Sequence, residues 1–343
     1  MTPKPFHENR YDSIQALRGI ASLFVVLEHI RFLNCGAFGV DIFFCISGFM
    51  MMFSTHTDSR HFLRKRLLRI LPFYYVMTVG TYLLLLWFPG MFAQTTGNPV
   101  YLIKSLLFIP FDIGGGVLQP LMRIGWTVNC EMFFYLLFFF SLHISHKYRG
   151  LICSGLLLLI TAGAGLFPNA PAPFRFYGNP IMLEFILGIL SYYFLQYLYG
   201  LYLRKGIPFS VSLFAALTAF FCFAGLLITK PHINILGFRR PLVWGLPAMV
   251  ILVCFFVMGL GIRMPSMLTR VGNMSFSLYL IHYYPVQLLD RLIFHFDACT
   301  PFTLFGVLVC LIVSLALAWV CWNIFEKRGK NKNFLHFFVD KSG

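Results

Sequence analysis

The chain has 343 residues, of which 59% are apolar, 18% are aromatic and only 11% are charged. Because about a quarter of the residues in a soluble domain are charged, this composition excludes an ordinary soluble protein and indicates a polytopic membrane protein. The net charge of +15 raises the question of nucleic acid. The lysines and arginines, however, cluster in short loops between apolar runs, which is typical of membrane topology signals, so we expect no nucleic-acid partner.

Ten apolar runs are long enough, at about 17–25 residues, to cross a bilayer core of roughly 30 Å as helices. The segment at 100–112 is shorter and is expected to be re-entrant or interfacial. No repeat or soluble domain interrupts the runs, so the sequence predicts an all-α, polytopic fold with one transmembrane domain over residues 1–343 and a short cytoplasmic tail at 327–343. The predicted spans are 16–34, 38–55, 67–88, 128–144, 150–167, 178–203, 208–228, 241–261, 273–296 and 302–325.

The charges of the loops orient these spans. With the N-terminus on the cytoplasmic side, 18 lysines and arginines fall in cytoplasmic stretches and 8 in outside stretches, and Arg18 lies within the first span. Since cytoplasmic loops carry an excess of Lys and Arg, both termini are predicted to be cytoplasmic. Only the loop at 229–240 runs against this rule. The polar start, MTPKPFHENRYDS, lacks a cleavable signal, so the first span itself is expected to direct insertion.

The nine cysteines are scattered singly, mostly in apolar runs, without a CxxC pair or a Cys/His ladder. This pattern indicates small packing residues, and we expect no metal site. Cys35 and Cys299 both fall in short loops, so a disulfide between them is an alternative.

Three ionisable residues lie in the first span, where each of them costs free energy. In the predicted topology Arg18 is near the cytoplasmic surface, and His29 lies about 16 Å further out on nearly the same helix face. Glu28 is about a quarter turn away from that face. An intramembrane imidazole beside a carboxylate is a candidate for acid–base chemistry, and an arginine at the inner surface suits a phosphate.

Other ionisable residues divide in the same way between the two sides of the membrane. The strongest basic cluster, RHFLRKRLLRILP, is predicted at the inner surface, where Arg66 and Arg69 share one helix face and can bind one anion together. Four residues are predicted between mid-membrane and the outer side: Asp41, Glu131, Glu184 and His282.

Most of these residues also have an ordinary structural explanation. Arg18 can extend to lipid phosphates, and the basic cluster can serve as a positive-inside anchor. Asp41 can cap its helix, and His282 or Glu184 can make an interhelical hydrogen bond. His29 is harder to explain structurally, because it follows a carboxylate and is aligned with an arginine.

A substrate that bridges Arg18 and His29 would be anionic at one end, extended, and reactive at the other. Acyl-coenzyme A has these properties, and its pantetheine arm has roughly that reach. Transfer of the acyl group to a hydroxyl needs a base for the hydroxyl proton and donors for the developing oxyanion. His29 is the predicted base. The candidate donors, among which the sequence leaves the choice open, are Thr127, Asn129, Asn273 and Ser275.

Six stretches follow one another between residues 11 and 326: YDSIQALRGIASLFVVLEH, GAFGVDIFFCISGFMM, FLRKRLLRILPFYY, WTVNCEMFFYLLFF, LEFILGIL and VGNMSFSLYLIHYYP. Together they resemble the membrane acyltransferase family 3, and within it the short exopolysaccharide acetyltransferases without an attached soluble domain. The resemblance implies transfer of an acyl group, usually acetyl, from cytoplasmic acetyl-CoA to a carbohydrate at the outer side. It also implies a multi-pass protein of the bacterial cytoplasmic (inner) membrane.

The resemblance implies roles for individual residues. The family's Arg-x10-His pattern falls on Arg18 and His29, and its Arg-x-x-Arg element falls on Arg66 and Arg69, so the three arginines are expected to bind the phosphates of acetyl-CoA. The expected catalytic residues are His29, Glu28, Glu131 and His282, with Glu28 or Glu131 orienting the imidazole of His29.

The remaining family elements suggest residues that contact the substrate or support the site. The family's Trp-Ser-Leu-x-x-Glu-x-x-x-Tyr stretch has Thr127 in place of Ser, which keeps a hydroxyl, and its Tyr-Leu-Ile-His element ends on His282. After the last span, FEKRG keeps Glu326 but lacks the family's proline, so this turn is expected to differ. The substrate or structural candidates are Asp41, Trp126, Thr127, Tyr135, Glu184 and Tyr279.

The expected partners are acyl-CoA as donor, a carbohydrate or lipid-linked glycan as acceptor, membrane lipids, and a second copy of the chain in a homodimer. The rival hypothesis is a transporter or flippase for a polar or glycan substrate, in which the same residues relay protons. It predicts inverted repeats, and the sequence shows none. A degenerate family member that acts only in complex assembly is not favoured, because the candidate residues are all present. The acceptor and the acyl group stay open at this stage.

Overall fold

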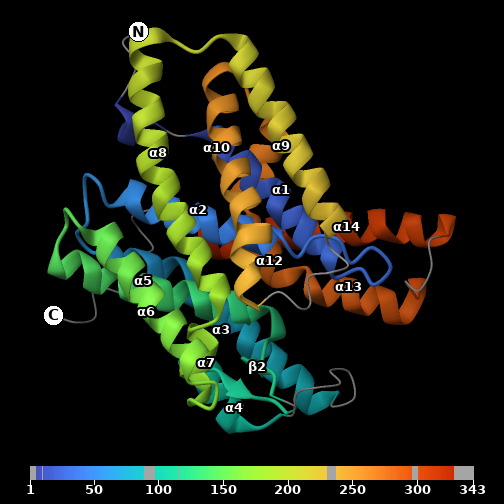
Figure 1. The fold of residues 1–343 in the computed structure, drawn as a ribbon. Coiled ribbons are helices and arrows are strands. Elements are labelled where there is room, and N and C mark those ends of the chain that lie inside the picture. The colour runs from blue at the N-terminus through green and yellow to red at the C-terminus, as the bar shows by residue number, and fades with distance from the viewer. Residues whose placement is uncertain are drawn as a thin grey trace, which may run out of the picture. The chain divides into compact units, whose positions relative to one another are not determined.

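Residues 5–9, 11–88, 97–114, 116–229, 237–295 and 300–327 are described by a computed structural model (Figure 1). The chain divides into two compact units. The first unit comprises Met1–Glu28, Leu33–Arg60 and Phe133–Asn273, and the second comprises His29–Phe32, His61–Met132 and Met274–Gly343. Each unit is therefore built from segments that lie far apart in the sequence.

The first unit is a bundle of helices. Its closest helix pairs are α2 with α8, α9 with α10, and α1 with α11. Figure 1 shows α8 and α9 as two long helices joined at one end. The elements are η1 (Phe6–Glu8), α1 (Asp12–Glu28), α2 (Gly39–Ser54), the later part of α5 (Trp126–Ile144), α6 (Arg149–Leu166), α7 (Ala172–Tyr177), η3 (Pro180–Met182), α8 (Leu183–Lys205), α9 (Phe209–Thr229), η5 (Gly237–Arg239), η6 (Pro241–Gly245), α10 (Leu246–Gly261) and α11 (Ser266–Asn273).

Small residues allow two of these pairs to approach closely. A Cβ on Gly48 of α2 would lie 2.1 Å from the carbonyl oxygen of Phe185 in α8, and a Cβ on Gly188 of α8 would lie 2.1 Å from that of Cys45. In the same way, a Cβ on Gly272 of α11 would lie 1.8 Å from the carbonyl oxygen of Gln15 in α1. Backbone-to-backbone packing at small residues is how helices associate in membranes, where burial of apolar surface drives little.

The second unit is also mainly helical and contains a short hairpin. Its helices α12 and α14 pack together, and α14 also contacts α13 (Figure 1). The elements are α3 (Phe62–Trp87), α4 (Pro99–Leu106), β1 (Phe111–Asp112), β2 (Leu118–Gln119), η2 (Arg123–Gly125), the start of α5, α12 (Ser275–Ile281), α13 (Tyr283–Leu289), η7 (Asp290–Phe294), α14 (Pro301–Cys321) and η8 (Trp322–Lys327).

The segment predicted to be re-entrant or interfacial, 100–112, is too short to cross a bilayer. It consists of the 8-residue helix α4 and the first strand of the hairpin, in which Phe111 pairs with Gln119. The side chain of Asn98 caps α4 by accepting a hydrogen bond from the backbone N–H of Val100 at 2.8 Å. The strands themselves were not expected from the sequence, because each has only two residues.

The element η8, which follows α14, is held to the start of α12 by Glu326. Its carboxylate accepts hydrogen bonds from the backbone N–H and the hydroxyl of Ser277, at 3.1 Å and 2.5 Å. A carboxylate is favourable there because the first N–H groups of a helix have no partner within the helix. Glu326, which the sequence retains without the family's proline, thus acts as a helix cap.

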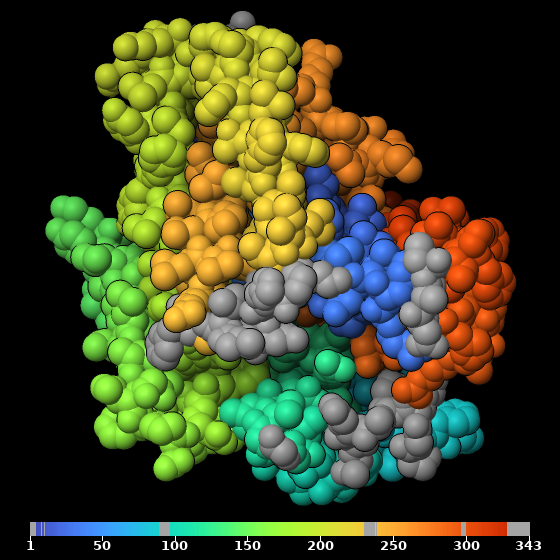
Figure 2. Space-filling view, turned by 45° about the vertical axis from the view of Figure 1, so that its right-hand side comes forward, coloured from blue at the N-terminus to red at the C-terminus, as the bar shows by residue number. Residues whose placement is uncertain are grey.

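Seven of the described helices are long and apolar enough to cross a membrane, and α2 is a shorter apolar helix. Each of the ten predicted spans contains helix, so the all-α polytopic class is confirmed, whereas the number of spans and the side of the termini stay predictions. The outward faces carry large apolar side chains, among them Phe214, Phe220 and Phe221 on α9, which forms an open yellow surface in Figure 2. Such faces suit contact with lipid.

Two expectations concern residues that lie outside the described part of the chain. One is the alternative of a Cys35–Cys299 disulfide, since Cys299 is among residues 296–299. The other is the structure of the predicted tail, of which residues 328–343 are not described.

Candidate functional site

The first helix ends where the predicted acid–base residues begin. Helix α1 stops at Glu28, six residues earlier than the predicted span, so His29 lies in the turn just after it. The Glu28 carboxylate accepts hydrogen bonds from the backbone N–H groups of Gly36 and Ala37, at 2.7 Å and 3.0 Å. Glu28 therefore closes the turn that leads into α2. The predicted alignment of Arg18 with His29 stays a prediction, because they belong to different units.

His29 and His282 meet within the second unit. The Nδ1 atom of His29 is 3.2 Å from Nε2 of His282, and the ring centroids are 4.8 Å apart with an interplanar angle of 68°. His282 is fully buried, and its Nδ1 lies 3.0 Å from the carbonyl oxygen of Leu278, one turn earlier in α12. Two predicted catalytic residues, 253 positions apart in the chain, are thus in direct contact.

These contacts determine which ring nitrogen of His29 and of His282 carries the hydrogen. A carbonyl oxygen only accepts, so Nδ1 of His282 carries the hydrogen that bonds to Leu278. In neutral His282 the Nε2 atom is then an acceptor, and the hydrogen between the two rings belongs to Nδ1 of His29. The lone pair of neutral His29 consequently resides on Nε2, which is the state that a general base requires.

An ion pair fixes the segment that carries His29. The guanidinium of Arg31 lies 2.8 Å from the carboxylate of Asp290 in η7, and the carboxylate is almost fully buried. Both contacts, at His29 and at Arg31, join the turn after α1 to residues on either side of α13. This pair was not predicted from the sequence, although the position of Asp290 as an acidic residue inside a predicted span was a signal for it.

The Tyr-Leu-Ile-His element contacts the start of α5. The hydroxyl of Thr127 donates to the hydroxyl of Tyr279 at 2.7 Å, and Tyr279 donates to the carbonyl oxygen of Ile124 at 2.9 Å. The rings of Tyr279 and His282 have their centroids 5.9 Å apart. The hydroxyl that Thr127 keeps is therefore used, and it ties two of the predicted elements together beside His282.

Four buried side-chain donors in the second unit have no hydrogen-bond partner among the described residues. On α14 and η8 they are the hydroxyl of Ser314 and Nε1 of Trp322. The other two, Nδ2 of Asn129 and the hydroxyl of Ser275, belong to fully buried residues beside the predicted site elements. The other end of the Asn129 amide accepts from the hydroxyl of Tyr74 at 3.4 Å. Because buried donors are usually paired, unpaired ones point to a ligand or an intermediate that completes them. Asn129 and Ser275 belong to the predicted set of oxyanion donors.

Asp41 and Glu184 form a charged cluster with Arg240 in the first unit. The guanidinium of Arg240 donates two hydrogen bonds to Asp41, at 3.0 Å and 2.9 Å, and lies over the ring of Trp244. Asp41 and Glu184 are fully buried and interact electrostatically, and the oxygens of Glu184 have no hydrogen-bond partner of good geometry in the described regions. The sequence predicted the two carboxylates separately and treated Arg240 only as a loop charge.

The other predicted residues are placed as follows. Arg66 and Arg69 lie near the start of α3, with the Arg66 guanidinium 5.8 Å from the ring centroid of Phe62. Arg18 is half-buried in α1. Trp126 begins α5, Glu131 is half-buried one turn later in it, and the buried Tyr135 belongs to the part of α5 in the first unit. Across the described ranges, no group of three or more His, Cys, Asp or Glu is arranged to hold a metal ion.

A second histidine cluster lies in the first unit, outside the predicted spans. The rings of His7 and His56 are stacked, with their centroids 3.4 Å apart and an interplanar angle of 11°. Nearby, the buried Arg149 donates to the carbonyl oxygen of Met52 and the hydroxyl of Thr55, so it caps the end of α2. Burial, then His56 and Arg149, lower the pKa of His7 to about 4, and burial and Arg149 also lower the pKa of His56.

Acidification is expected to destabilise the protein through this cluster. Below the ordinary histidine pKa of 6.5 the unfolded chain binds protons that folded His7 and His56 do not bind, so the free energy of unfolding falls as pH falls towards about 4 and is unaffected above 6.5. Thermal unfolding in detergent at about pH 7.5 and pH 5 measures the effect. The variant His7→Gln should lose less stability on acidification than the native chain, and the exposed-site control His143→Gln should behave like the native chain. Equal losses in all three would contradict the role of the cluster.

Comparison with known proteins identifies the family of the chain. The model of an acyltransferase domain family matches residues 11–322. The exopolysaccharide production protein ExoZ of Rhizobium meliloti (strain 1021) is 27% identical over 315 residues, which cover 86% of this chain and 91% of ExoZ. BcsY of Komagataeibacter xylinus, whose name describes a membrane-bound transacylase, is 30% identical over 146 residues, or 39% of this chain and 38% of BcsY. No solved structure matches the chain. With nearly its whole length matched and apolar helices throughout, the chain belongs to the membrane acyltransferase family 3.

Proposed function

We propose that this acyltransferase transfers an acetyl group from cytoplasmic acetyl-CoA to a hydroxyl of an exported carbohydrate, in the bacterial cytoplasmic membrane. The contact between His29 and His282 at 3.2 Å carries the proposal, because it leaves His29 in the tautomer that a general base needs. The name of ExoZ, an exopolysaccharide production protein, supports a carbohydrate acceptor. Arg18, Arg66 and Arg69 are the proposed ligands of the donor's phosphates.

The proposed reaction is an acyl transfer with one general base. Nε2 of His29 takes the proton of the acceptor hydroxyl while its oxygen attacks the carbonyl carbon of the thioester. The tetrahedral oxyanion then collapses, the carbon–sulfur bond breaks, and the thiolate of coenzyme A takes the proton back from Nε2. The products are the acetyl ester and free coenzyme A, and the imidazole is regenerated.

His282 acts in this scheme as a positioning residue. As a neutral acceptor it holds the Nδ1–H of His29, and this hydrogen bond strengthens when His29 becomes an imidazolium. The unpartnered donors Asn129 and Ser275 are the proposed stabilisers of the oxyanion, because each has a polar hydrogen available in a buried setting.

Variants of His282 test this assignment in purified protein with acetyl-CoA and a polysaccharide acceptor. His282→Ala removes the acceptor for His29 and should lower kcat about 100-fold, at the lower end of what general base catalysis contributes. His282→Gln keeps a carbonyl oxygen near the position of Nε2 and should recover part of that loss. A shifted pH profile of kcat in His282→Ala separates a positioning role from a purely structural one. Equal activity in both variants and the native protein would contradict it.

The rival hypothesis, a transporter or flippase, is distinguished by the same assay. A transporter moves its solute without cleaving acetyl-CoA, whereas the proposed enzyme releases free coenzyme A in step with ester formation. Release of coenzyme A that depends on both the acceptor and His29 supports the enzyme. Absence of release by a correctly folded protein, tested with chemically deacetylated polymer as the acceptor, favours the rival.

A further inference from the structure

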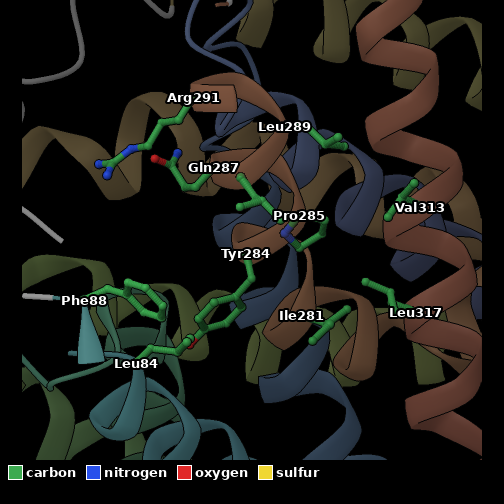
Figure 3. A pocket seen from close by; sticks show the side chains of 11 residues that line it. Leu84, Phe88, Ile281, Tyr284, Pro285, Gln287, Leu289, Arg291, Val313 and Leu317 are labelled. Atoms are coloured by element: carbon green, nitrogen blue, oxygen red, sulfur yellow. The ribbon is translucent and has the colours of Figure 1, made fainter. Parts of the chain in front are cut away.

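An apolar groove lies beside His282 in the second unit. It has a volume of about 600 Å³ and is lined by residues of α3, α12, α13, η7 and α14 (Figure 3). This volume is within the range of small-molecule binding sites. The lining is almost entirely apolar, and it includes Ile281, the residue before His282. His282, which follows this lining residue in the chain, contacts the proposed base His29.

The groove is open towards the lipid-facing side of its helices. Leu288 of α13 and Leu317 of α14 line it and are 44% and 40% exposed. Both lie in helices that the sequence places in the membrane. A cavity that opens sideways between membrane helices is accessible to the hydrocarbon chain of a lipid, and its apolar lining costs such a chain no desolvation.

Two polar side chains mark one end of the groove. Gln287 and Arg291 belong to its lining and point to the same side in Figure 3. Arg291 is exposed, and no carboxylate of the described residues forms an ion pair with it. A guanidinium beside an amide suits a phosphate group, which it can bind through two parallel hydrogen bonds. In the predicted topology Arg291 is about 13 Å further out than His282, towards the outer surface.

We propose that this groove binds the hydrocarbon tail of a lipid-linked carbohydrate acceptor, whose phosphate binds at Arg291. This inference rests on the proposed function and names the class of its acceptor. The apolar lining of the groove complements the hydrocarbon tail of such a lipid. The cation at one end of the groove, Arg291, complements its phosphate. Anchoring the lipid tethers its glycan to the enzyme, which raises the effective concentration of the reacting hydroxyl at the site.

Farnesyl phosphate is a suitable probe, because it joins an isoprenoid chain to a phosphate and carries no sugar. We expect saturable binding of one molecule per chain to the purified protein in detergent, measured by native mass spectrometry and equilibrium dialysis. Farnesol, which lacks the phosphate, should bind about ten-fold more weakly, as expected for the loss of a charge-assisted contact. Phosphatidylglycerol in equal amount should leave the binding unchanged. Displacement of the probe by phosphatidylglycerol would show a site for bulk lipid and overturn the proposal.

Substitutions locate the probe. Leu317→Trp fills the groove and Arg291→Gln removes its cation, so each should weaken binding of farnesyl phosphate about ten-fold. The matched control is Ile312→Trp on the same helix, 65% exposed and outside the lining, which should change binding less than about two-fold. Equal binding by all four proteins would overturn the proposal. Because this assay needs no acetyl transfer, such a result leaves the proposed function standing, whereas failure of the native protein to acetylate any acceptor refutes the proposed function itself.

Discussion

Replacing His29 by alanine is expected to abolish acetyl transfer while leaving the protein folded. Removal of a general base typically costs 10²–10⁴-fold in rate, so the acetyl content of the surface polysaccharide should fall to the background of a deletion strain. The side chain is only half-buried and lies in a turn after α1, so the fold does not depend on it. The measurement is acetyl content per repeating unit in cells that express equal amounts of each protein.

Two further variants sharpen this test. His143→Ala, at an exposed position near the end of α5, should retain native acetylation. The double variant His29→Ala with His282→Ala should be no less active than His29→Ala alone, because His282 acts through His29, and residues that act as a unit are not additive. A stable His29→Ala protein with full acetylation would refute the assignment of the base.

Of the proposed substitutions, Arg240→Met is expected to lower the free energy of unfolding most. Asp41 and Glu184 are fully buried, and Arg240 is the cation that pairs with Asp41. Breaking a buried ion pair by removing one partner costs about 3–5 kcal/mol, because it leaves an uncompensated charge in a medium of low polarity. The Arg240→Met protein should therefore unfold at a temperature lower by on the order of 10 °C.

The adjacent residue supplies the control for this prediction. Arg239 is exposed, so Arg239→Met removes the same charge from a neighbouring position without leaving a buried carboxylate unpaired. Adding Asp41→Asn to Arg240→Met removes the orphaned charge and should restore part of the lost stability. Thermal unfolding in one detergent compares all three proteins. Indistinguishable transitions for Arg240→Met and Arg239→Met would mean that the cluster contributes little to folding.

The candidate site could be predicted in part because ionisable residues inside a membrane are costly. This reasoning selected His29, His282, Asp41 and Glu184, and the structure places these residues in two polar clusters, one in each unit. It did not find Arg240, the partner of Asp41, or the ion pair between Arg31 and Asp290. Arg240 was assigned to a loop by its position between two apolar runs, although its side chain reaches back to a carboxylate 199 positions earlier in the chain.

The role of Glu28 illustrates what a local pattern leaves open. Its position beside His29 suggested a group that orients the imidazole, since adjacent acidic and basic residues often interact. In the structure the α-helix ends at Glu28, and the carboxylate binds the backbone N–H groups of Gly36 and Ala37. The sequence contained the charge and its neighbour, but the direction of the side chain depends on where the helix ends.

The sequence by itself determined the class of the protein. Long apolar runs and the asymmetry of loop charges follow from the thickness and polarity of a bilayer, and these act on each segment separately. Family motifs likewise occupy short stretches of neighbouring residues. Only the tertiary structure decided that His29 faces His282, that Leu278 sets the proton of that pair, and that Arg240 meets Asp41. The contact with Leu278 is local, one helical turn away, but the other two join residues far apart in the chain, and packing between helices, which no local pattern encodes, brings these within hydrogen-bond distance.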